Sequence, residues 1–166
     1  MNRQAIRAVA LDVDGVLTDG GVWWGPHGEE WKRFHFSDIM GVSLATRAGL
    51  LITLISGEDS PLVDRFAAKL GLTGIAKGCK DKAAALREFA ARQGFGLDTV
   101  GFIGDDVNDL AAIALAGWSA APANAHPSVK AQVDFVTGRT GGNGAVREAL
   151  DHLLAARPVI SSPVPK

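Results

Sequence analysis

Short runs of apolar residues alternate along the chain with longer segments in which apolar residues recur every three or four positions. Each short run is apolar on both faces, as a strand covered on both sides of a sheet must be. The predicted strands are 8–11, 51–55, 100–103, 118–120 and, more weakly, 135–136, and the predicted helices are 39–48, 62–70, 82–92, 109–116 and 145–154. Strand and helix in repeated alternation predict an α/β fold with a doubly wound, Rossmann-like parallel sheet.

One segment, residues 20–36, interrupts this alternation. Two extended runs flank Gly25-Pro26-His27-Gly28, which has the composition of a turn, so we predict a protruding β-hairpin. The end of the chain, 157–166, has no periodicity, and we expect a flexible tail there. The remainder, 1–156, is predicted to be a single domain into which the hairpin is inserted.

The composition narrows the class of protein. The 166 residues include 47% hydrophobic side chains, which suffice for a full core, and the net charge is −1 from 17 basic and 18 acidic residues. This balance argues against nucleic acid or an anionic membrane as a partner, because both need a basic surface. The single cysteine, Cys79, cannot form an internal disulfide and is expected to be inert. Without an apolar run long enough to cross a bilayer, we expect a cytoplasmic protein.

Polar residues gather where the predicted strands end, and ligand sites of open α/β sheets lie at these carboxyl ends. Asp12 and Asp14 follow the first strand, Ser56 and Gly57 follow the second, and Asp105 follows the third. Side chains two positions apart on an extended chain point the same way, so three carboxylates are expected close together. A divalent cation relieves their repulsion, and an all-oxygen ligand set suits Mg²⁺. The pattern predicts a magnesium site that receives a phosphate.

Other residues at the same edge suit a phosphate group. Ser56 offers a hydroxyl, Gly57 a backbone N–H, and Lys82 a positive charge that can offset charge on a phosphoryl group. Gly15 allows the backbone to turn sharply beside a ligand. Each residue alone has an ordinary alternative, as a turn residue, a helix cap or a solvated lysine. Their occurrence in order, each at a strand end or helix start, favours a site for phosphoryl transfer.

At this point the residues resemble a known superfamily. Asp12-Val13-Asp14-Gly15-Val16-Leu17-Thr18 resembles the DxDGxxT motif of the haloacid dehalogenase-like hydrolases. Ser56, Lys82 and the segment 104–109 resemble that superfamily's three further motifs, in the right order. The chain is most similar to the 3-deoxy-D-manno-octulosonate 8-phosphate (KDO 8-phosphate) phosphatases, through residues 16–41, 104–110, 125–137 and 141–148.

The resemblance implies a two-step hydrolysis of a phosphomonoester. Asp12 would attack phosphorus to form an aspartyl-phosphate, and Asp14 would protonate the leaving alcohol and then deprotonate the attacking water. The resemblance also implies Mg²⁺ bound by the Asp12 carboxylate, the Asp14 backbone carbonyl and Asp105, with Asp109 and Asp106 supporting these ligands. The residues expected to bind phosphate or substrate, besides the catalytic Lys82, are Gly15, Thr18, Asp38, Ser56, Gly57, Glu58, Lys69 and Arg147.

The spacing of the motifs leaves no room for a lid domain. The chain between Asp12 and Ser56 holds the hairpin and one helix, and that between Ser56 and Lys82 holds a helix and a short strand. An active-site crevice without a lid would be open to water and unselective, so we expect a neighbouring subunit to close it. Aromatic residues on a hairpin suit such an interface, although they could also pack on their own core. Three of the four tryptophans lie there: Trp23, Trp24 and Trp31. The resembled family is tetrameric, with hairpins forming a central barrel and tails reaching neighbouring sites.

The chain departs from the resembled family at one motif. KDO 8-phosphate phosphatases usually carry Thr-Gly-Arg where this chain has Ser56-Gly57-Glu58, which reverses a charge near the expected sugar carboxylate. A related branch that acts on KDN or N-acetylneuraminate 9-phosphate resembles this chain in having Glu there and a lysine eleven residues later, here Lys69. Alternatively, Glu58 caps a helix that starts near Ser60 and Lys69 is solvated. The expected substrate is a 2-keto-3-deoxy sugar acid phosphate with eight or nine carbons.

Several residues and functions keep an alternative at this stage. Asp38 is either a helix cap or, by resemblance, near the site, and Arg147 either meets an anionic group or pairs locally. His35 and His126 are more often surface or hydrogen-bonded residues than ligands. A phosphotransferase is disfavoured because no lid excludes water. A non-catalytic tetramerisation module, like those attached to some nonulosonate cytidylyltransferases, would have lost catalytic residues, and this chain has lost none.

Overall fold

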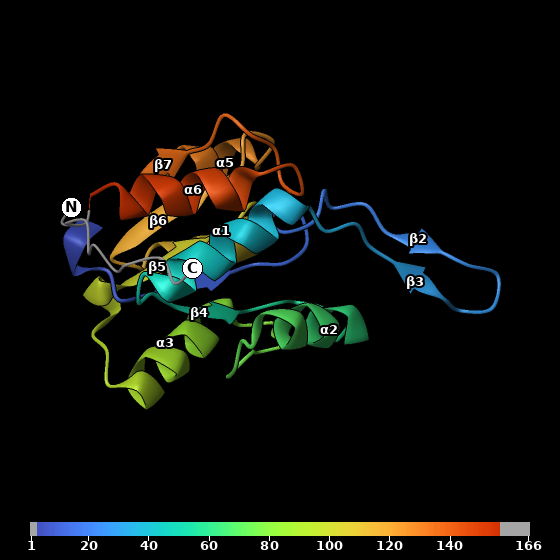
Figure 1. Ribbon diagram of the computed structural model, residues 1–166, viewed down its shortest axis with the longest axis horizontal. Helices are drawn as coiled ribbons and strands as arrows, with labels where there is room; N and C mark the ends of the chain where they lie inside the picture. Colours follow the sequence, from blue (N-terminus) through green and yellow to red (C-terminus); the bar gives the residue numbers. More distant parts are fainter. Residues whose placement is uncertain (1–2, 157–166) are drawn as a thin grey trace, which may run out of the picture.

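The central sheet has five parallel strands. The computed structural model describes residues 3–156, so the predicted tail 157–166 lies outside the described residues. The strand order is β4-β1-β5-β6-β7 (Figure 1). The strands are β1 (Ala8–Leu11), β4 (Leu51–Leu54), β5 (Val100–Ile103), β6 (Trp118–Ala121) and β7 (Phe135–Val136). The predicted parallel α/β sheet is therefore confirmed.

Helices cover both faces of this sheet. They are α1 (Phe36–Arg47), α2 (Pro61–Leu70), α3 (Lys82–Gln93), α4 (Leu110–Ile113), α5 (Pro127–Lys130) and α6 (Ala145–Leu154). Three short 3₁₀ helices accompany them: η1 (Arg3–Ala5), η2 (Leu97–Thr99) and η3 (Val107–Asp109). Val9 and Leu11 of β1 belong to the core under α1, α2 and α6, whereas Ala8 and Ala10 belong to the core under α3, α4 and α5. Successive side chains of this buried strand thus pack into two different hydrophobic cores, one on each face of the sheet.

Two helices differ from their predicted form. In place of the predicted helix 109–116, the structure has the 3₁₀ helix η3, which ends at Asp109, followed by the single α-helical turn α4. A capping box between Asp106 and Asp109 fixes the start of η3. Helix α1 begins at Phe36 rather than at residue 39, because His35 Nδ1 accepts the N–H of Ser37 at 3.2 Å and caps it. The one-turn helix α5 was not predicted, since a single turn has no detectable periodicity.

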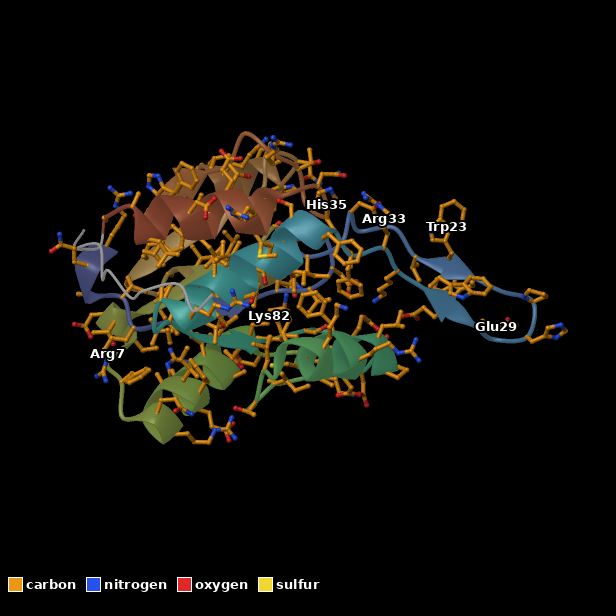
Figure 2. The ribbon with its side chains drawn as sticks, viewed as in Figure 1. Arg7, Trp23, Glu29, Arg33, His35 and Lys82 are labelled. Carbon is orange, nitrogen blue, oxygen red and sulfur yellow. The ribbon has the colours of Figure 1, made fainter. Side chains whose placement is uncertain are left out.

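The hairpin projects away from the domain (Figure 1). Strands β2 (Trp23–Trp24) and β3 (Glu30–Trp31) pair antiparallel, with Trp23 opposite Trp31. Trp23 is 71% exposed, Trp24 76% and Trp31 54%, so the alternative that these side chains pack on their own core is wrong. Figure 2 shows Trp23 and Glu29 on this projection and Lys82 within the body of the domain.

The sheet carries no large cap over the residues that the structure describes. The segments between β1 and β4 and between β4 and α3 hold only the hairpin, α1 and α2. None of the helices in the described part of the chain is long and apolar enough to cross a membrane.

Candidate active site

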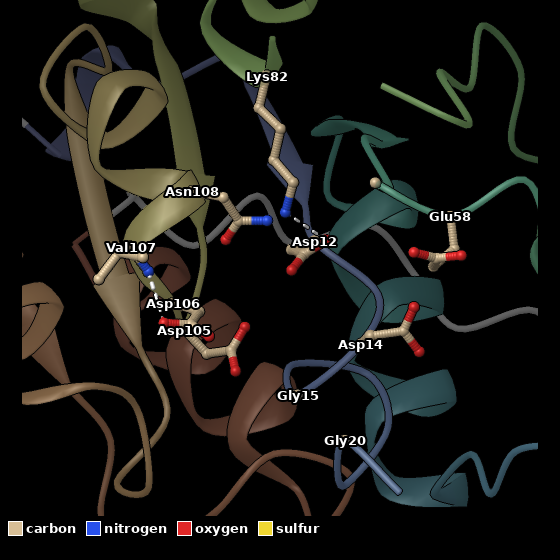
Figure 3. Close-up of a pocket in the computed structure, with 11 residues that line it drawn as sticks. Asp12, Asp14, Gly15, Gly20, Glu58, Lys82, Asp105, Asp106, Val107 and Asn108 are labelled. Carbon is tan, nitrogen blue, oxygen red and sulfur yellow. Dashed lines mark hydrogen bonds and ion pairs between the residues drawn. The ribbon is translucent and has the colours of Figure 1, made fainter. Parts of the chain in front are cut away.

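The carboxyl ends of β1, β4 and β5 meet at one edge of the sheet, since these three strands are neighbours. Asp12 follows β1, Ser56 lies just beyond β4, and Asp105 follows β5 by two residues. A cavity of about 340 Å³ opens at this edge (Figure 3). It is lined by Asp12, Asp14, Gly15, Gly20, Gly57, Glu58, Lys82, Asp105, Asp106, Val107 and Asn108. The topology therefore brings together most of the residues that the sequence singled out.

Lys82 lies at the floor of this cavity. It is the first residue of α3, whose N-cap Asp81 accepts the N–H of Ala84 at 2.9 Å. Its side chain is 2% exposed, and its Nζ lies 2.9 Å from Asp12 Oδ1 and 2.6 Å from Asp109 Oδ1. Burial alone would lower the pKa of this ammonium group, but the two carboxylates outweigh burial and raise it. The alternative of a solvated helix lysine is wrong.

Asp109 organises the loop after β5. Its carboxylate is fully buried, with Oδ1 on Lys82 and Oδ2 accepting the backbone N–H of Asp105 at 2.9 Å and of Asp106 at 3.2 Å. A Cβ on Gly104 would stand 2.6 Å from this carboxyl group, so only glycine allows such a close approach. Asp109 thereby couples the position of Asp105 to that of Lys82.

Three carboxylates converge beside this lysine. Oxygens of Asp12, Asp105 and Asp109 lie within 4.8 Å of one another, and this group could hold a metal ion. Burial, with the charge of Asp109 added, raises the pKa of Asp12 to about 8 and that of Asp105 to about 7, although Lys82 opposes both shifts. A Cβ on Gly15 would clash with Asp105 Oδ2, so only glycine at this position leaves room for Asp105 in the cluster. Uncompensated negative charge and an all-oxygen donor set fit a hard divalent cation.

Asp14 faces the cavity from the loop that follows Asp12 (Figure 3). Its Oδ1 lies 2.8 Å from the Nζ of Lys32, a residue just beyond β3 that the sequence analysis did not single out. In the structure, burial alternates from Glu30 to Phe34 with period two, so Lys32 lies on the same inward side as both, a placement that the sequence pattern did not reveal. Phe34 on that side stacks on Phe66 at 4.7 Å between ring centroids.

The segment Ser56-Gly57-Glu58 lies across the cavity from Asp105 and Asp106 (Figure 3). Ser56 is fully buried, and its Oγ accepts the backbone N–H of Glu58 at 3.2 Å. Gly57 and Glu58 line the cavity, and the Glu58 carboxylate lies on the same side as Asp14 (Figure 3). The N-cap of α2 is Ser60, which accepts the N–H of Leu62, so the alternative that Glu58 caps this helix is wrong.

Thr18 and Asp38, both predicted as site residues, are buried and hold backbone groups outside the cavity lining. Thr18 Oγ1 accepts the N–H of Gly15 at 3.3 Å and of Gly20 at 3.2 Å, which closes the loop after β1. Asp38 is 1% exposed and accepts the N–H of Gly144 at 3.0 Å and of Arg147 at 2.9 Å. Both side chains therefore act here through the loops and helix ends that they fix.

Lys69 and Arg147 lie apart from the cavity. Lys69 is exposed on α2, with its Nζ 5.9 Å from the centroid of the Phe36 ring. Arg147 donates from Nε to Asp151 at 2.6 Å and borders a separate cavity of about 510 Å³. His35 and His126 cap helices α1 and α5, as their ordinary alternative predicted.

Comparison with known sequences identifies relatives of this chain. Residues 60–150 match the family described as haloacid dehalogenase-like hydrolase. The KDO 8-phosphate phosphatase KdsC of Escherichia coli is 38% identical over 152 residues, which are 92% of this chain and 81% of the relative. The corresponding enzyme of Haemophilus influenzae is 39% identical over 152 residues, covering 92% of this chain and 84% of its own length.

Solved structures of KDO 8-phosphate phosphatases have the same fold as this chain. A KDO 8-phosphate phosphatase from Moraxella catarrhalis, in complex with magnesium, phosphate and KDO, superposes with a TM-score of 0.91 at 36% identity. The alignment covers 94% of this chain and 90% of that one. The cobalt-bound enzyme of Haemophilus influenzae superposes with a TM-score of 0.91 at 38% identity, covering 95% and 92% of the two chains.

Proposed function

This chain belongs to the haloacid dehalogenase-like phosphatases of the KDO 8-phosphate phosphatase family, and from that membership we propose that it hydrolyses a 2-keto-3-deoxy sugar acid phosphate with Mg²⁺. The observation that carries this proposal is the buried Lys82, held between Asp12 and Asp109 beside Asp105 at the floor of the cavity. Asp12, Lys82 and Asp105 line one cavity of about 340 Å³, with Asp109 behind them, and this arrangement supports a site for a phosphate ester.

In the proposed mechanism Asp12 is the nucleophile and Asp14 the general acid and base. An Asp12 oxygen forms a bond to phosphorus while the bond from phosphorus to the sugar oxygen breaks, and Asp14 gives its proton to that oxygen. Asp14 then takes a proton from a water molecule that attacks the aspartyl-phosphate, which releases inorganic phosphate and restores Asp12. Lys82 keeps Asp12 oriented and offsets charge that develops on the phosphoryl oxygens.

The residues that would hold Mg²⁺ are the Asp12 and Asp105 carboxylates and the Asp14 backbone carbonyl. Asp109, whose two oxygens are engaged by Lys82 and by backbone N–H groups, would complete the acidic cluster and fix Asp105. When bound, the cation neutralises part of the charge shared by the carboxylates and the phosphate.

The phosphate group would bind between Ser56, Gly57 and Lys82, with Gly15 leaving space for it. Thr18 and Asp38 would support the site indirectly, through the loop and helix end that they fix. Lys69 and Arg147 lie outside this cavity, so in this proposal they reach only a substrate bound to a neighbouring subunit.

The substrate is proposed to carry eight or nine carbons. The Moraxella relative bound to KDO supports an eight-carbon acid, whereas Glu58 at the cavity mouth favours the nine-carbon acids over KDO 8-phosphate. Purified protein with Mg²⁺ is expected to release phosphate from KDO 8-phosphate, KDN 9-phosphate or N-acetylneuraminate 9-phosphate, faster than from simple sugar phosphates. The ratio of kcat/KM for the nine-carbon acids to kcat/KM for KDO 8-phosphate shows which of the two sizes of sugar acid is preferred. No release from any of the three acids would refute the proposed function.

A variant pair tests the proposed nucleophile. Asp12→Asn is expected to abolish turnover, because an amide cannot attack phosphorus, while the circular dichroism spectrum stays unchanged. Asp64→Asn is the matched control, since Asp64 is exposed on α2 and pairs with Lys77 away from the cavity. Full activity of Asp12→Asn would show that the reaction does not pass through Asp12.

We also propose a homotetramer with shared active sites. The exposed tryptophans of the hairpin support an interface, because three large aromatic side chains in solvent are costly for an isolated chain. The open cavity without a cap supports closure by a neighbouring subunit.

A further inference from the structure

Lys32 is a lysine whose charged end is enclosed by carboxylates. Its side chain is 5% exposed, and its Nζ lies 2.8 Å from Asp14 Oδ1 and 3.5 Å from Glu30 Oε1. Asp14 lines the site cavity, whereas Lys32 is not among its lining residues. Its aliphatic stem borders a separate apolar cavity with Trp31 and Phe34, as a buried lysine stem is expected to do.

Glu30 is itself anchored to the body of the domain. Its Oε1 accepts a hydrogen bond of 3.0 Å from the Oγ of Ser60, which is 5% exposed and caps helix α2. This hydrogen bond, followed by the ion pair with Lys32, lowers the pKa of Glu30, so Glu30 is charged at neutral pH. A continuous chain of polar contacts thus runs from Ser60 through Glu30 and Lys32 to Asp14.

The burial of Lys32 needs a compensating interaction. Removing an ammonium group from water is costly unless it is paired, whereas an exposed surface pair adds little stability. Burial alone would lower the pKa of Lys32, but the contacts with Asp14 and Glu30 outweigh burial and raise it. The Lys32 ammonium group is therefore held in one place beside Asp14 by two carboxylates.

We propose that Lys32 is a positioning residue that fixes the Asp14 carboxyl group for proton transfer to the leaving alcohol. By binding Oδ1, the ammonium group limits rotation of the carboxyl group and leaves Oδ2 free to exchange a proton with the substrate. This inference rests on the proposed function, in which Asp14 is the general acid. It also makes the base of the hairpin part of the reaction, because Lys32 follows β3 directly.

The test uses two kinds of leaving group. Lys32→Met is expected to lower kcat/KM for a sugar phosphate about 10- to 100-fold, within the range of general acid catalysis. The loss for p-nitrophenyl phosphate should be less than about threefold, because its phenolate departs without a proton. KM should stay within about twofold of the wild type, since Lys32 does not contact the substrate.

Lys32→Arg should recover part of the activity. Lys77→Met is the matched control, because Lys77 also bridges two carboxylates, Asp59 and Asp64.

A double variant separates positioning from a merely structural role. If Lys32 acts through Asp14, the variant carrying both Asp14→Asn and Lys32→Met should be no slower than Asp14→Asn alone. Equal losses on both substrates, a raised KM, or a further loss in the double variant would overturn the proposal. Lys32→Gln replaces Lys32→Met if thermal melting shows that methionine unfolds the hairpin region.

The same measurements distinguish this inference from the proposed function. Full activity of Lys32→Met on sugar phosphates, beside an inactive Asp14→Asn, would refute the positioning role alone. Full activity of Asp14→Asn would refute the catalytic assignment of Asp14, and with it the positioning role of Lys32, whereas the proposed hydrolysis of a sugar acid phosphate would stand.

Discussion

At the scale of single residues, the site is defined by an imbalance of charge. Asp12, Asp105 and Asp109 place three carboxyl groups within reach of one ammonium group, that of Lys82. Lys82 and two backbone N–H groups donate hydrogen bonds to the Asp109 carboxylate. Asp12 and Asp105 are left with raised pKa values of about 8 and about 7, because burial and the charge of Asp109 disfavour their ionised forms. The metal-free protein therefore retains protons that a cation would displace.

Metal binding is expected to depend on pH in a definite direction. Below about pH 7 both Asp12 and Asp105 hold protons, and a protonated carboxyl group is a poor ligand. The apparent affinity for Mg²⁺ should rise as pH increases from 6 to 8 and level off only above the Asp12 pKa of about 8. Calorimetric titration in buffers of different ionisation enthalpy should detect protons released on binding at pH 6.5. Equal affinities at pH 6 and pH 8, without proton release, would contradict this prediction.

At the scale of elements, helices α1 and α6 are joined by a buried polar contact. Asp38 in the first turn of α1 accepts the N–H groups of Gly144 and Arg147, where α6 begins. The N-cap of α6 is Gly144, which has no side chain for this purpose, so Asp38 serves as the acceptor from another helix. Burial raises the pKa of Asp38, while these two hydrogen bonds act to lower it.

Substitution of Asp38 is expected to affect stability more than catalysis. Asp38→Ala leaves two buried N–H groups without an acceptor, which costs about 2–4 kcal/mol of unfolding free energy. Urea denaturation measures this loss, and kcat of the folded variant should stay within about threefold of the wild type. Ser37→Ala is a matched control at the neighbouring position. A large increase in KM with unchanged stability would instead identify Asp38 as a substrate-binding residue.

At the scale of the whole molecule, a compact domain with two cores carries a projection that has almost no core of its own. The hairpin pairs through two residues on each strand, and its large side chains are exposed. An isolated two-stranded hairpin is only marginally stable in water, so contacts with other copies would stabilise it. Lys32 and Glu30 connect the base of this projection to Asp14 in the site.

Removal of the hairpin aromatics is expected to dissociate the proposed tetramer. The double substitution Trp23→Ser and Trp24→Ser removes exposed apolar surface and leaves both sheet cores intact. Light scattering should report a smaller particle than for the wild type, with an unchanged circular dichroism spectrum. Val107→Ser, which removes an exposed apolar side chain at the cavity, is the control. A wild-type protein that is already monomeric would refute the tetramer.

The sequence by itself determined the sheet, its longer flanking helices α1, α2, α3 and α6, and the central carboxylates. Runs such as 8–11 and 100–103 are apolar on both faces, and only a strand buried between two helical layers satisfies them. Because parallel strands end at the same edge, Asp12 and Asp105 had to meet once β1 and β5 paired. Local pattern and topology are sufficient for those residues, and Lys82 follows from its place at the start of α3.

Only the tertiary structure decided which other polar residues belong to the site. Lys32, just beyond β3, pairs with Asp14 in the loop after β1, whereas Asp38 accepts the N–H groups at the start of α6 and does not line the cavity. Thr18 and Arg147 match motifs equally well. In the structure Thr18 accepts the backbone N–H of Gly15, and Arg147 pairs with Asp151 of its own helix. These outcomes depend on contacts between residues distant in sequence, which compete for the same polar groups and leave no local pattern in the chain.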